Sequence, residues 1–421
     1  MLRIIRSSDK RALGRLFRAR ATMLAGAERT AQKILEDVRR ERDRALIQYA
    51  RKFDGLDLRR SGFMVSPEEI RDAYQSVPKE FVQSLRVAAA NIRKTARRQM
   101  PRPWRIIATE GIKVSQVVRP LGRVACYVPG GRFPLPSTVL MSVIPAQVAG
   151  VREVLVTSPR PAPAVLVAAD MLGVQKIFRL GGAQAVAAFA FGTESVPRAD
   201  KIVGPGNRYV AAAKKLLAGE CGIDFVAGPS ELVVVADRGE PEWIAADLVA
   251  QAEHDPDAVA IFITPSIRLA LQVQAATSQT VERLRLPVAS KALEGQGAIM
   301  VTRDLGEAVQ FANELAPEHL TLLGGAELLL DQIHSAGSIF LGGFSPVAAG
   351  DYASGTNHIL PTGGAARLRG GLSAADFVKA ITVQRLNRTG LTTLRKTLVN
   401  LARTEGLEAH AYSVEARFKA Q

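Results

Sequence analysis

Four short segments in the second half of this 421-residue chain carry side chains that can bind metals or transfer protons. Each contains a glycine or a proline, and the segments are Gln251–Pro256, Ala316–Leu320, Gly350–Tyr352 and Glu405–His410. The chain has only five histidines, and three of them fall inside these segments. This concentration predicts that the segments meet in one active site.

Two imidazoles, one carboxylate and one amide oxygen in these segments form a possible donor set for a metal ion, namely Gln251, His254, Asp351 and His410. Gln251 and His254 are three residues apart at the predicted end of a helix, so both project from one face. Nitrogen and oxygen donors without thiolates suit Zn²⁺, or Mn²⁺ and Co²⁺ in its place, as a catalytic metal. Each segment also has an ordinary interpretation: His254 as a polar residue at a helix end, and Asp351 as a turn residue in a flexible glycine-rich stretch.

Glu318 and His319 are adjacent residues that can transfer protons. Pro317 ends the preceding helix, which predicts that the pair faces a cleft from a loop or a helix end. Because neighbouring side chains point in different directions, the two groups could serve two separate proton transfers. Histidine is the natural base near neutral pH, and a partly buried glutamate could activate water. An exposed pair at a loop edge is the alternative interpretation.

Three glycine-containing turns directly follow predicted strands, at Tyr127–Gly131, Gly181–Gln184 and Gly204–Asn207. Glycine lets the backbone approach a ligand closely, and the start of a following helix favours phosphate. None of the turns is a GxGxxG fingerprint, and each alone could be an ordinary tight turn. Three such turns at strand ends of one sheet indicate the place where α/β proteins bind ligands.

From about residue 122 onward, short β-branched runs alternate with alanine-rich helical stretches, which predicts parallel sheets with βαβ crossovers. The predicted strands are 154–156, 176–180, 201–203, 231–235, 258–263, 298–301, 321–323 and 338–341. The predicted helices are 163–172, 184–191, 209–218, 241–254, 267–284, 305–315 and 326–335. The fold class is therefore α/β, with two Rossmann-like parallel-sheet domains and small helical N- and C-terminal segments.

The composition, 47% hydrophobic and 23% charged residues, is that of a soluble globular protein. No apolar run approaches the roughly 20 residues that span a bilayer. The net charge of +15 would suit a polyanion, but the basic residues are scattered and aromatics are only 5%, so no nucleic-acid partner is expected. Cys126 and Cys221 have no CxxC partner and are predicted to be packing residues in a cytoplasmic protein.

The ordered series of motifs resembles the histidinol dehydrogenase family over nearly the whole chain. The motifs are Tyr127–Gly131, Gly204–Asn207, Ala227–Glu231, Gln251–His254, Ala316–His319, Gly350–Tyr352 and Asn357–Gly364. This family oxidises L-histidinol to L-histidine through histidinal, reducing two NAD in succession with zinc and water. A related zinc- and NAD-dependent dehydrogenase of another small alcohol, such as a sulfonated diol, is the alternative.

The resemblance implies a role for each candidate residue. It assigns zinc binding to Gln251, His254, Asp351 and His410, and proton transfer to Glu318 and His319. It assigns NAD contacts to Tyr127, Gln184 and Asn207. It assigns substrate contacts to Ser230 and Glu405, together with the zinc ligands and His319. The family is a homodimer in which the C-terminal tail completes the partner's site, which would place Glu405 and His410 in the neighbouring subunit's site.

The expected domain organisation has four parts. Residues 1–24 form an N-terminal helical arm, and residues 373–421 form a helical tail that completes the dimer. The first α/β domain, with a helical lead-in and the metal and base residues, combines residues 25–126 and 235–372. The second α/β domain, residues 127–234, binds the dinucleotide.

Overall fold

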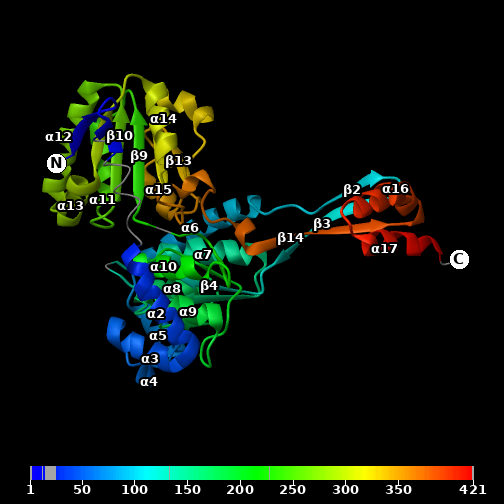
Figure 1. The fold of residues 1–421 in the computed structure, drawn as a ribbon. Coiled ribbons are helices and arrows are strands. Elements are labelled where there is room, and N and C mark those ends of the chain that lie inside the picture. Colours follow the sequence, from blue (N-terminus) through cyan, green and yellow to red (C-terminus); the bar gives the residue numbers. More distant parts are fainter. Residues whose placement is uncertain (1, 12, 15–24, 132, 227, 420–421) are drawn as a thin grey trace. The chain divides into compact units, whose positions relative to one another are not determined.

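Two parallel sheets dominate the computed structural model, which describes residues 2–11, 13–14, 25–131, 133–226 and 228–419 (Figure 1). The chain divides into a first unit of residues 1–99 and 121–377, which holds both sheets, and a second unit of residues 100–120 and 378–421. The predicted α/β fold class is confirmed. Half of the predicted N-terminal arm, namely residues 1, 12 and 15–24, lies outside the described residues.

The five-stranded sheet of the first unit has the order β6-β5-β4-β7-β8, with all strands parallel. Its strands are β4 (Arg123–Tyr127), β5 (Glu153–Thr157), β6 (Ile177–Phe178), β7 (Lys201–Val203) and β8 (Gly222–Ile223). The helices between them are α7 (Pro136–Ala149), α8 (Pro163–Met171), α9 (Gly182–Phe191) and α10 (Arg208–Leu217). The connections run in one direction from β4 to β6 and in the other from β7, so the switch point lies between β4 and β7.

The six-stranded sheet has the order β1-β11-β10-β9-β12-β13 and is also parallel. Its strands are β1 (Arg3–Arg6), β9 (Glu231–Ala236), β10 (Val259–Thr264), β11 (Ala298–Val301), β12 (His319–Leu323) and β13 (Ser338–Leu341). From β9 onward it repeats the strand order of the five-stranded sheet, with its switch point between β9 and β12. The strand β1 was not predicted.

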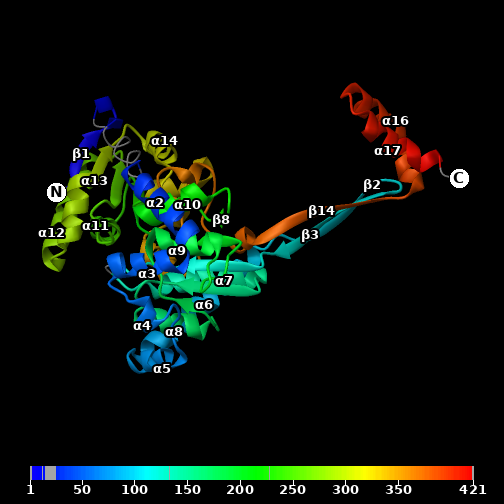
Figure 2. The ribbon, with the colours of Figure 1, turned by 60° about the horizontal axis from the view of Figure 1, so that its bottom comes forward.

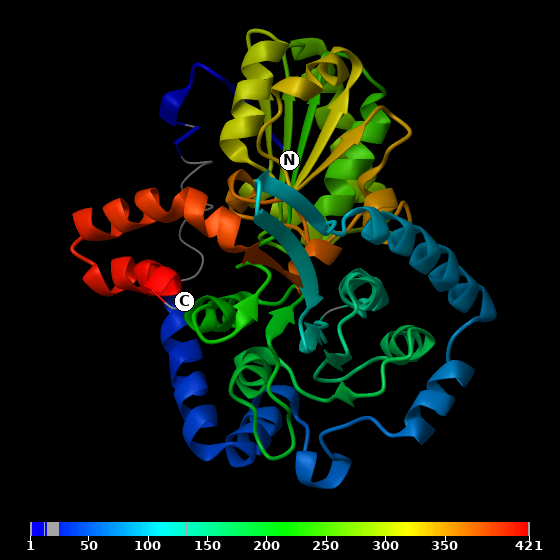
Figure 3. The ribbon, with the colours of Figure 1, turned by 90° about the vertical axis from the view of Figure 1, so that its right-hand side faces the viewer.

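Helices cover both faces of the six-stranded sheet (Figure 3). One face packs against α11 (Pro241–Ala252), α12 (Ile267–Leu284) and α13 (Pro287–Gln296). The other packs against α14 (Leu305–Leu315) and the 3₁₀ helix η2 (Gly324–Gln332). Successive residues of β9 point to opposite faces of the sheet, because side chains alternate along a strand. Val234 packs on the face covered by α11, α12 and α13, and Val233 on the face covered by α14 and η2.

The helical lead-in contains α2 (Ala25–Glu41), α3 (Asp43–Tyr49), the π-helical turn η1 (Ala50–Asp54), α4 (Leu58–Ser61), α5 (Pro67–Gln75) and α6 (Lys79–Arg98). Ser66 and Glu69 form the capping box at the start of α5. These helices pack against the helices of the five-stranded sheet, α2 on α9 and α10, α5 on α8, and α6 on α7. They were expected to belong with residues 235–372, and an apolar helix face alone does not specify which sheet it packs near.

The sheets also begin before the expected domain boundaries. Strand β4 starts at Arg123, whereas the dinucleotide domain was expected from residue 127. Strand β9 starts at Glu231, whereas the following domain segment was expected from residue 235.

The second unit is an antiparallel sheet followed by a helical hairpin (Figure 2). It contains β2 (Trp104–Thr109), β3 (Ile112–Pro120), β14 (Val378–Leu386), α16 (Arg388–Thr404) and α17 (Glu408–Lys419). The order of the strands is β14-β3-β2. The sequence predicted the helical tail but not these three strands.

Both cysteines are buried, as predicted for packing residues. Burial raises the pKa of Cys126 to about 12 and that of Cys221 to about 11, so neither thiol is activated as a nucleophile. In the described part of the chain, no helix combines the length and the apolar character needed to cross a membrane.

Candidate functional site

Glu318 and His319 lie at the start of β12 in the first unit. Helix α14 ends at Leu315, and Ala316 takes a left-handed conformation with φ 45° that turns the chain toward the strand. Both side chains are buried, at 6% and 4% exposure, so the interpretation as an exposed pair is excluded. Glu318 Oε2 lies 3.6 Å from His319 Nδ1, which corrects the expectation that the two side chains point apart.

The backbone of Glu231, the first residue of β9, orients both side chains. Its N–H donates to Glu318 Oε2 at 2.8 Å, and its carbonyl oxygen lies 3.2 Å from His319 Nδ1. A carbonyl can only accept, so Nδ1 carries the proton and the lone pair of neutral His319 is on Nε2. This Nε2 atom is buried and has no hydrogen-bond partner among the described residues. It is therefore available to take a proton from a ligand.

The carboxylates around His319 control its protonation. Burial raises the pKa of Glu318 to about 8, although His319 and the N–H of Glu231 oppose this. Burial lowers the pKa of His319, but Glu318 and Asp351 outweigh it and raise the pKa to about 9. Burial would raise the pKa of Asp351, but His319 lowers it below its usual range. Three buried ionisable groups thus form one coupled set, a common property of catalytic sites.

Asp351, a predicted metal ligand, lies in the short helix α15 (Val347–Tyr352), so its alternative interpretation as a turn residue in a flexible stretch does not hold. Its Oδ1 atom is 3.4 Å from His319 Nε2, without the geometry of a hydrogen bond. The carboxylate therefore faces the same space as the lone pair of the histidine.

Gln251 and His254 come from the end of α11, which packs against α15. The amide of Gln251 is buried, and its Nε2 has no hydrogen-bond partner among the described residues. His254 lies beyond the helix end at Ala252 and is exposed, yet it is close enough to help lower the pKa of Asp351. Three of the four predicted metal ligands thus gather around α11 and α15.

Asp247 and His358 are two further residues of this region that received no role from the sequence. Asp247 lies one turn before Gln251 and accepts the backbone N–H of Val347 at the start of α15, and burial raises its pKa to about 6. His358 Nδ1 lies 2.8 Å from the carbonyl oxygen of Asp351, and its Nε2 lies 3.2 Å from Thr138 Oγ1 on α7. Each residue had a signal in the sequence that could have identified it. Asp247 lies four residues before Gln251, and so on the same helix face, and His358 lies within the Asn357–Gly364 motif.

Glu405 and His410 belong to the second unit. Glu405 is the C-cap of α16, and His410 lies in the first turn of α17. Both are exposed. Among the described residues, no three histidine, cysteine, aspartate or glutamate side chains are grouped so that they could hold a metal ion.

The predicted dinucleotide residues lie at the carboxyl edge of the five-stranded sheet. Tyr127 ends β4 and Gly204 follows β7, so these two residues flank the switch point. The Tyr127 hydroxyl accepts the N–H of Gly182 at 3.0 Å, and burial raises its pKa to about 12. Asn207 caps α10 by accepting the N–H groups of residues 209 and 210 at 3.0 and 3.2 Å.

Gln184 lies in the first turn of α9 and is 1% exposed. Its Nε2 donates to Asp54 Oδ2 at 3.4 Å. Its Oε1 atom is buried and has no hydrogen-bond partner among the described residues. A buried acceptor without a partner is costly, and a ligand that donates a hydrogen bond would relieve that cost.

The proposed dinucleotide residues and the Glu318–His319 pair lie at opposite edges of their two sheets, although the sheets share one strand order. Tyr127 and Gly204 lie at carboxyl ends of strands, where open α/β sheets bind ligands. Glu318 and His319 lie at the amino end of β12, and the half-buried Ser230 immediately precedes the amino end of β9. The general rule for α/β proteins therefore predicts the first group but not the second.

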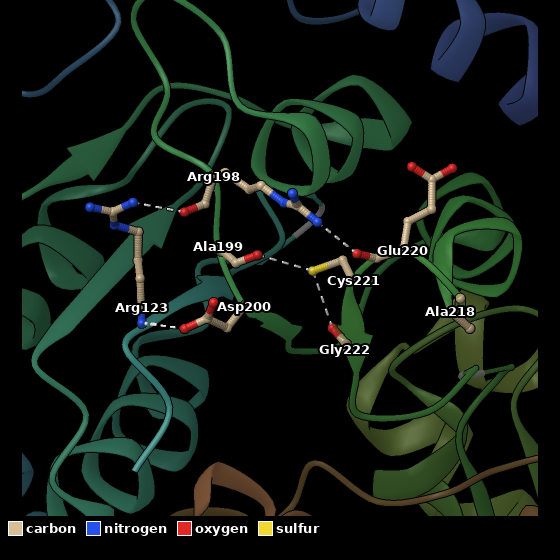
Figure 4. A pocket seen from close by; sticks show the side chains of 9 residues that line it. Arg123, Arg198, Ala199, Asp200, Ala218, Glu220, Cys221 and Gly222 are labelled. Carbon is tan, nitrogen blue, oxygen red and sulfur yellow. Dashed lines mark hydrogen bonds between the residues drawn. The ribbon is translucent and has the colours of Figure 1, made fainter. Parts of the chain in front are cut away.

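A surface pocket of about 640 Å³ lies at the amino edge of the five-stranded sheet (Figure 4). Arg123 donates to the carbonyl oxygen of Arg198 at 2.8 Å, and Arg198 donates to that of Glu220 at 3.1 Å. These guanidinium groups already hold carbonyl oxygens of the protein. None of the predicted site residues lines this pocket, so we do not assign it to the candidate site.

Comparison with known proteins relates nearly the whole chain to one family. The sequence profile of the family described as histidinol dehydrogenase matches residues 18–418. The histidinol dehydrogenase of Methanothermobacter thermautotrophicus is 48% identical over 395 residues, 92% of each chain. That of Syntrophotalea carbinolica is 47% identical over 429 aligned residues, covering 100% of both chains. The crystal structure of histidinol dehydrogenase from Elizabethkingia anophelis matches with a TM-score of 0.94 at 38% identity, covering 100% of this chain and 98% of that one.

Proposed function

Because the chain belongs to the histidinol dehydrogenase family, a family of oxidoreductases, we propose that it oxidises L-histidinol through L-histidinal to L-histidine with two NAD. These are the last steps of histidine biosynthesis, and the two buried thiols fit a reducing cytoplasm. The observation that carries the proposal is the buried His319 Nε2, which lies 3.4 Å from Asp351 Oδ1 and has no hydrogen-bond partner among the described residues.

In the first oxidation, His319 Nε2 takes the hydroxyl proton of the alcohol. The carbon–hydrogen bond breaks, its electron pair leaves with the hydrogen as hydride, and the carbon–oxygen double bond forms. NAD⁺, when bound, supplies the acceptor for that hydride. The hydrogen bond from Nδ1 to the carbonyl of Glu231 keeps the Nε2 lone pair directed at the substrate.

In the second oxidation, Glu318 takes a proton from the water whose oxygen bonds to the aldehyde carbon. The hydrate anion that forms would lose a hydride from the same carbon, for which a second NAD⁺ would supply the acceptor, and this leaves a carboxylic acid. A carboxylate whose pKa burial raises to about 8 is a stronger base than an ordinary glutamate. The contact of Glu318 Oε2 with the imidazole of His319, 3.6 Å from Nδ1, places both side chains close enough to act on one bound substrate.

Several features of the carboxyl edge of the five-stranded sheet fit a dinucleotide. The N-termini of α9 and α10 open at this edge, and helix N-termini favour the pyrophosphate. The buried Gln184 Oε1 has no donor within the described part of the chain, and a hydroxyl or amide of the cofactor would supply one. Tyr127, Gln184 and Asn207 remain the proposed NAD contacts.

The donor set of the first unit fits zinc. Gln251, His254 and Asp351 provide an amide, an imidazole and a carboxylate whose pKa is lowered, so that it is ionised. The buried Gln251 Nε2 has no hydrogen-bond partner in the described ranges, and a half-turn of the amide would direct its oxygen at a cation instead. Zn²⁺, when bound, supplies a positive centre that holds the amine and imidazole of histidinol. His410 is the proposed fourth ligand.

The second unit supports the proposed homodimer. It exposes large apolar side chains on its strands and helices, namely Trp104, Ile106, Ile107, Ile381, Val383, Leu401, Leu407 and Tyr412. Exposed large apolar side chains in this number are typical of a surface that contacts another protein chain. We therefore propose that a partner subunit covers it, and that Glu405 and His410 act in the partner's site together with Ser230 of that subunit.

The function is tested by incubating the purified protein with zinc, NAD and L-histidinol. We expect two NADH for each histidinol consumed and histidine as the product. The same assay after chelation should show no turnover, and added zinc should restore it. Activity on a sulfonated diol without activity on histidinol would instead support the related dehydrogenase.

The exchange of tails is tested by mixed dimers of a His319→Ala subunit and a His410→Ala subunit. If each tail completes the partner's site, one site receives both intact residues, and the mixed dimer should have about half of the wild-type activity. If each tail serves its own subunit, both sites lack one residue. An inactive mixed dimer would therefore contradict the exchange, and dimers of each single variant are the controls.

A further inference from the structure

We propose that the buried ion pair of Lys214 and Asp224 is a positioning device for the dinucleotide, because it fixes the backbone of Gly204 at the switch point. The inference rests on the proposed function, since it assigns these residues to the binding of NAD. Neither side chain would touch the cofactor. Both would act through the loop that they hold.

The pair holds both polar groups of the Gly204 backbone. Asp224, which follows β8, accepts the N–H of Gly204 through Oδ2 at 2.7 Å. Lys214, on α10, donates from Nζ to the carbonyl oxygen of Gly204 at 3.0 Å. Lys214 Nζ also forms an ion pair with Asp224 Oδ1, and the two residues are only 1% and 4% exposed. The ion pair therefore connects the loop of residues 204–207 to the end of β8 and to α10.

Gly204 needs this support because of its conformation. It leaves β7 with φ +114°, which side-chain-bearing residues rarely adopt, and a Cβ atom there would overlap the carbonyl oxygen of Tyr127. The loop thus passes directly over the end of β4 and continues to Asn207, the N-cap of α10. Displacement of Gly204 would change the spacing of two proposed NAD contacts, Tyr127 and Asn207.

The burial of two charges also calls for a reason beyond stability. Taking both ions out of water costs several kcal/mol per ion, so a buried pair is weak support for stability and often serves to specify a conformation. Here the hydrogen bonds of the pair are made to a loop, since Phe225 N–H also donates to Asp224 Oδ1 at 2.7 Å. Lys215, the next residue, is half exposed and pairs with Glu28 on α2 at 2.7 Å, so it provides a matched control.

The test is the double variant Lys214→Met/Asp224→Asn, which keeps the side-chain volumes and removes both charges. We expect its Kd for NAD, measured by isothermal titration calorimetry, to rise roughly ten- to hundredfold, as loss of a charged hydrogen bond predicts. The KM for NAD should rise by a similar factor, whereas kcat at saturating NAD, the KM for histidinol and the zinc content should stay unchanged. Lys215→Met should leave all of these values as they are in the wild type.

The double variant is preferred to Lys214→Met alone, which leaves a buried carboxylate without its partner and is expected to unfold more easily. Circular dichroism and the thermal midpoint establish that the double variant is folded. A folded double variant that binds NAD as tightly as the wild type would overturn the positioning role while leaving the proposed function intact. A wild-type protein that binds no NAD would instead overturn both.

Discussion

Replacement of His319 by alanine is expected to lower kcat for histidinol oxidation by about 10²- to 10⁴-fold, the usual contribution of a general base. The lone pair on Nε2 is the one positioned to take the alcohol proton, and alanine supplies no substitute. Zinc content should remain at the wild-type level, because His319 is not among the proposed ligands. Steady-state kinetics with NAD and metal analysis of the same preparation would measure both quantities.

His334→Ala is a suitable control, because this histidine is exposed and its backbone N–H, which alanine keeps, donates to Asn313. It should retain wild-type kinetics. If the His319→Ala protein lost its zinc together with its activity, the division of roles between ligands and bases would be wrong.

Replacement of Glu318 by glutamine is expected to stop the reaction at the aldehyde. Glutamine can still accept the N–H of Glu231 but cannot take a proton from water, so the second oxidation should slow by about 10²- to 10⁴-fold. Consumption of each histidinol should then yield one NADH instead of two, and direct assay with histidinal should show the same defect. A variant that still yields two NADH at the wild-type rate would refute the role of Glu318.

The same variant should change the pH dependence of the first oxidation. The neighbouring carboxylates raise the pKa of His319 to about 9, so below that pH the imidazole is protonated and cannot act as a base. The wild-type rate of the first step should therefore increase as the pH rises toward 9. Glu318→Gln removes one of these carboxylates, which lowers the pKa of His319. The rising limb of the pH–rate profile should therefore move to lower pH in this variant. An unchanged limb would show that another group limits the rate.

Much of the fold could be predicted because hydrophobic runs and alanine-rich helices report directly on a buried parallel sheet. The predicted strand 231–235 and helix 267–284 correspond to β9 and α12 almost residue for residue. Strand β14, which carries the exposed Ile381 and Val383, was missed because its apolar residues are not buried within its own unit. Such a strand lacks the alternation of buried and polar positions that identifies a half-buried strand.

The site was less predictable, because its contacts join residues far apart in sequence. Residue types and the family resemblance suggested Glu318, His319 and Asp351, but not the contact of His319 with the backbone of Glu231. Lys214 was likewise indistinguishable from Lys215 in the sequence, although one is buried in an ion pair and the other lies at the surface. Only the three-dimensional structure distinguishes these two neighbouring lysines.

The backbone of Glu231 has a consequence for what a replacement at this position would change. Its N–H and carbonyl aim the two bases, and every residue except proline supplies both groups. The side chain of Glu231 is itself buried and accepts the N–H of Gly363 at 3.1 Å, so a replacement there would disturb its surroundings even where the two backbone groups remained. The aim of the two bases therefore depends on the pairing of β9 with β12, whereas replacement of the Glu231 side chain would act through Gly363 and through the pKa of Glu318.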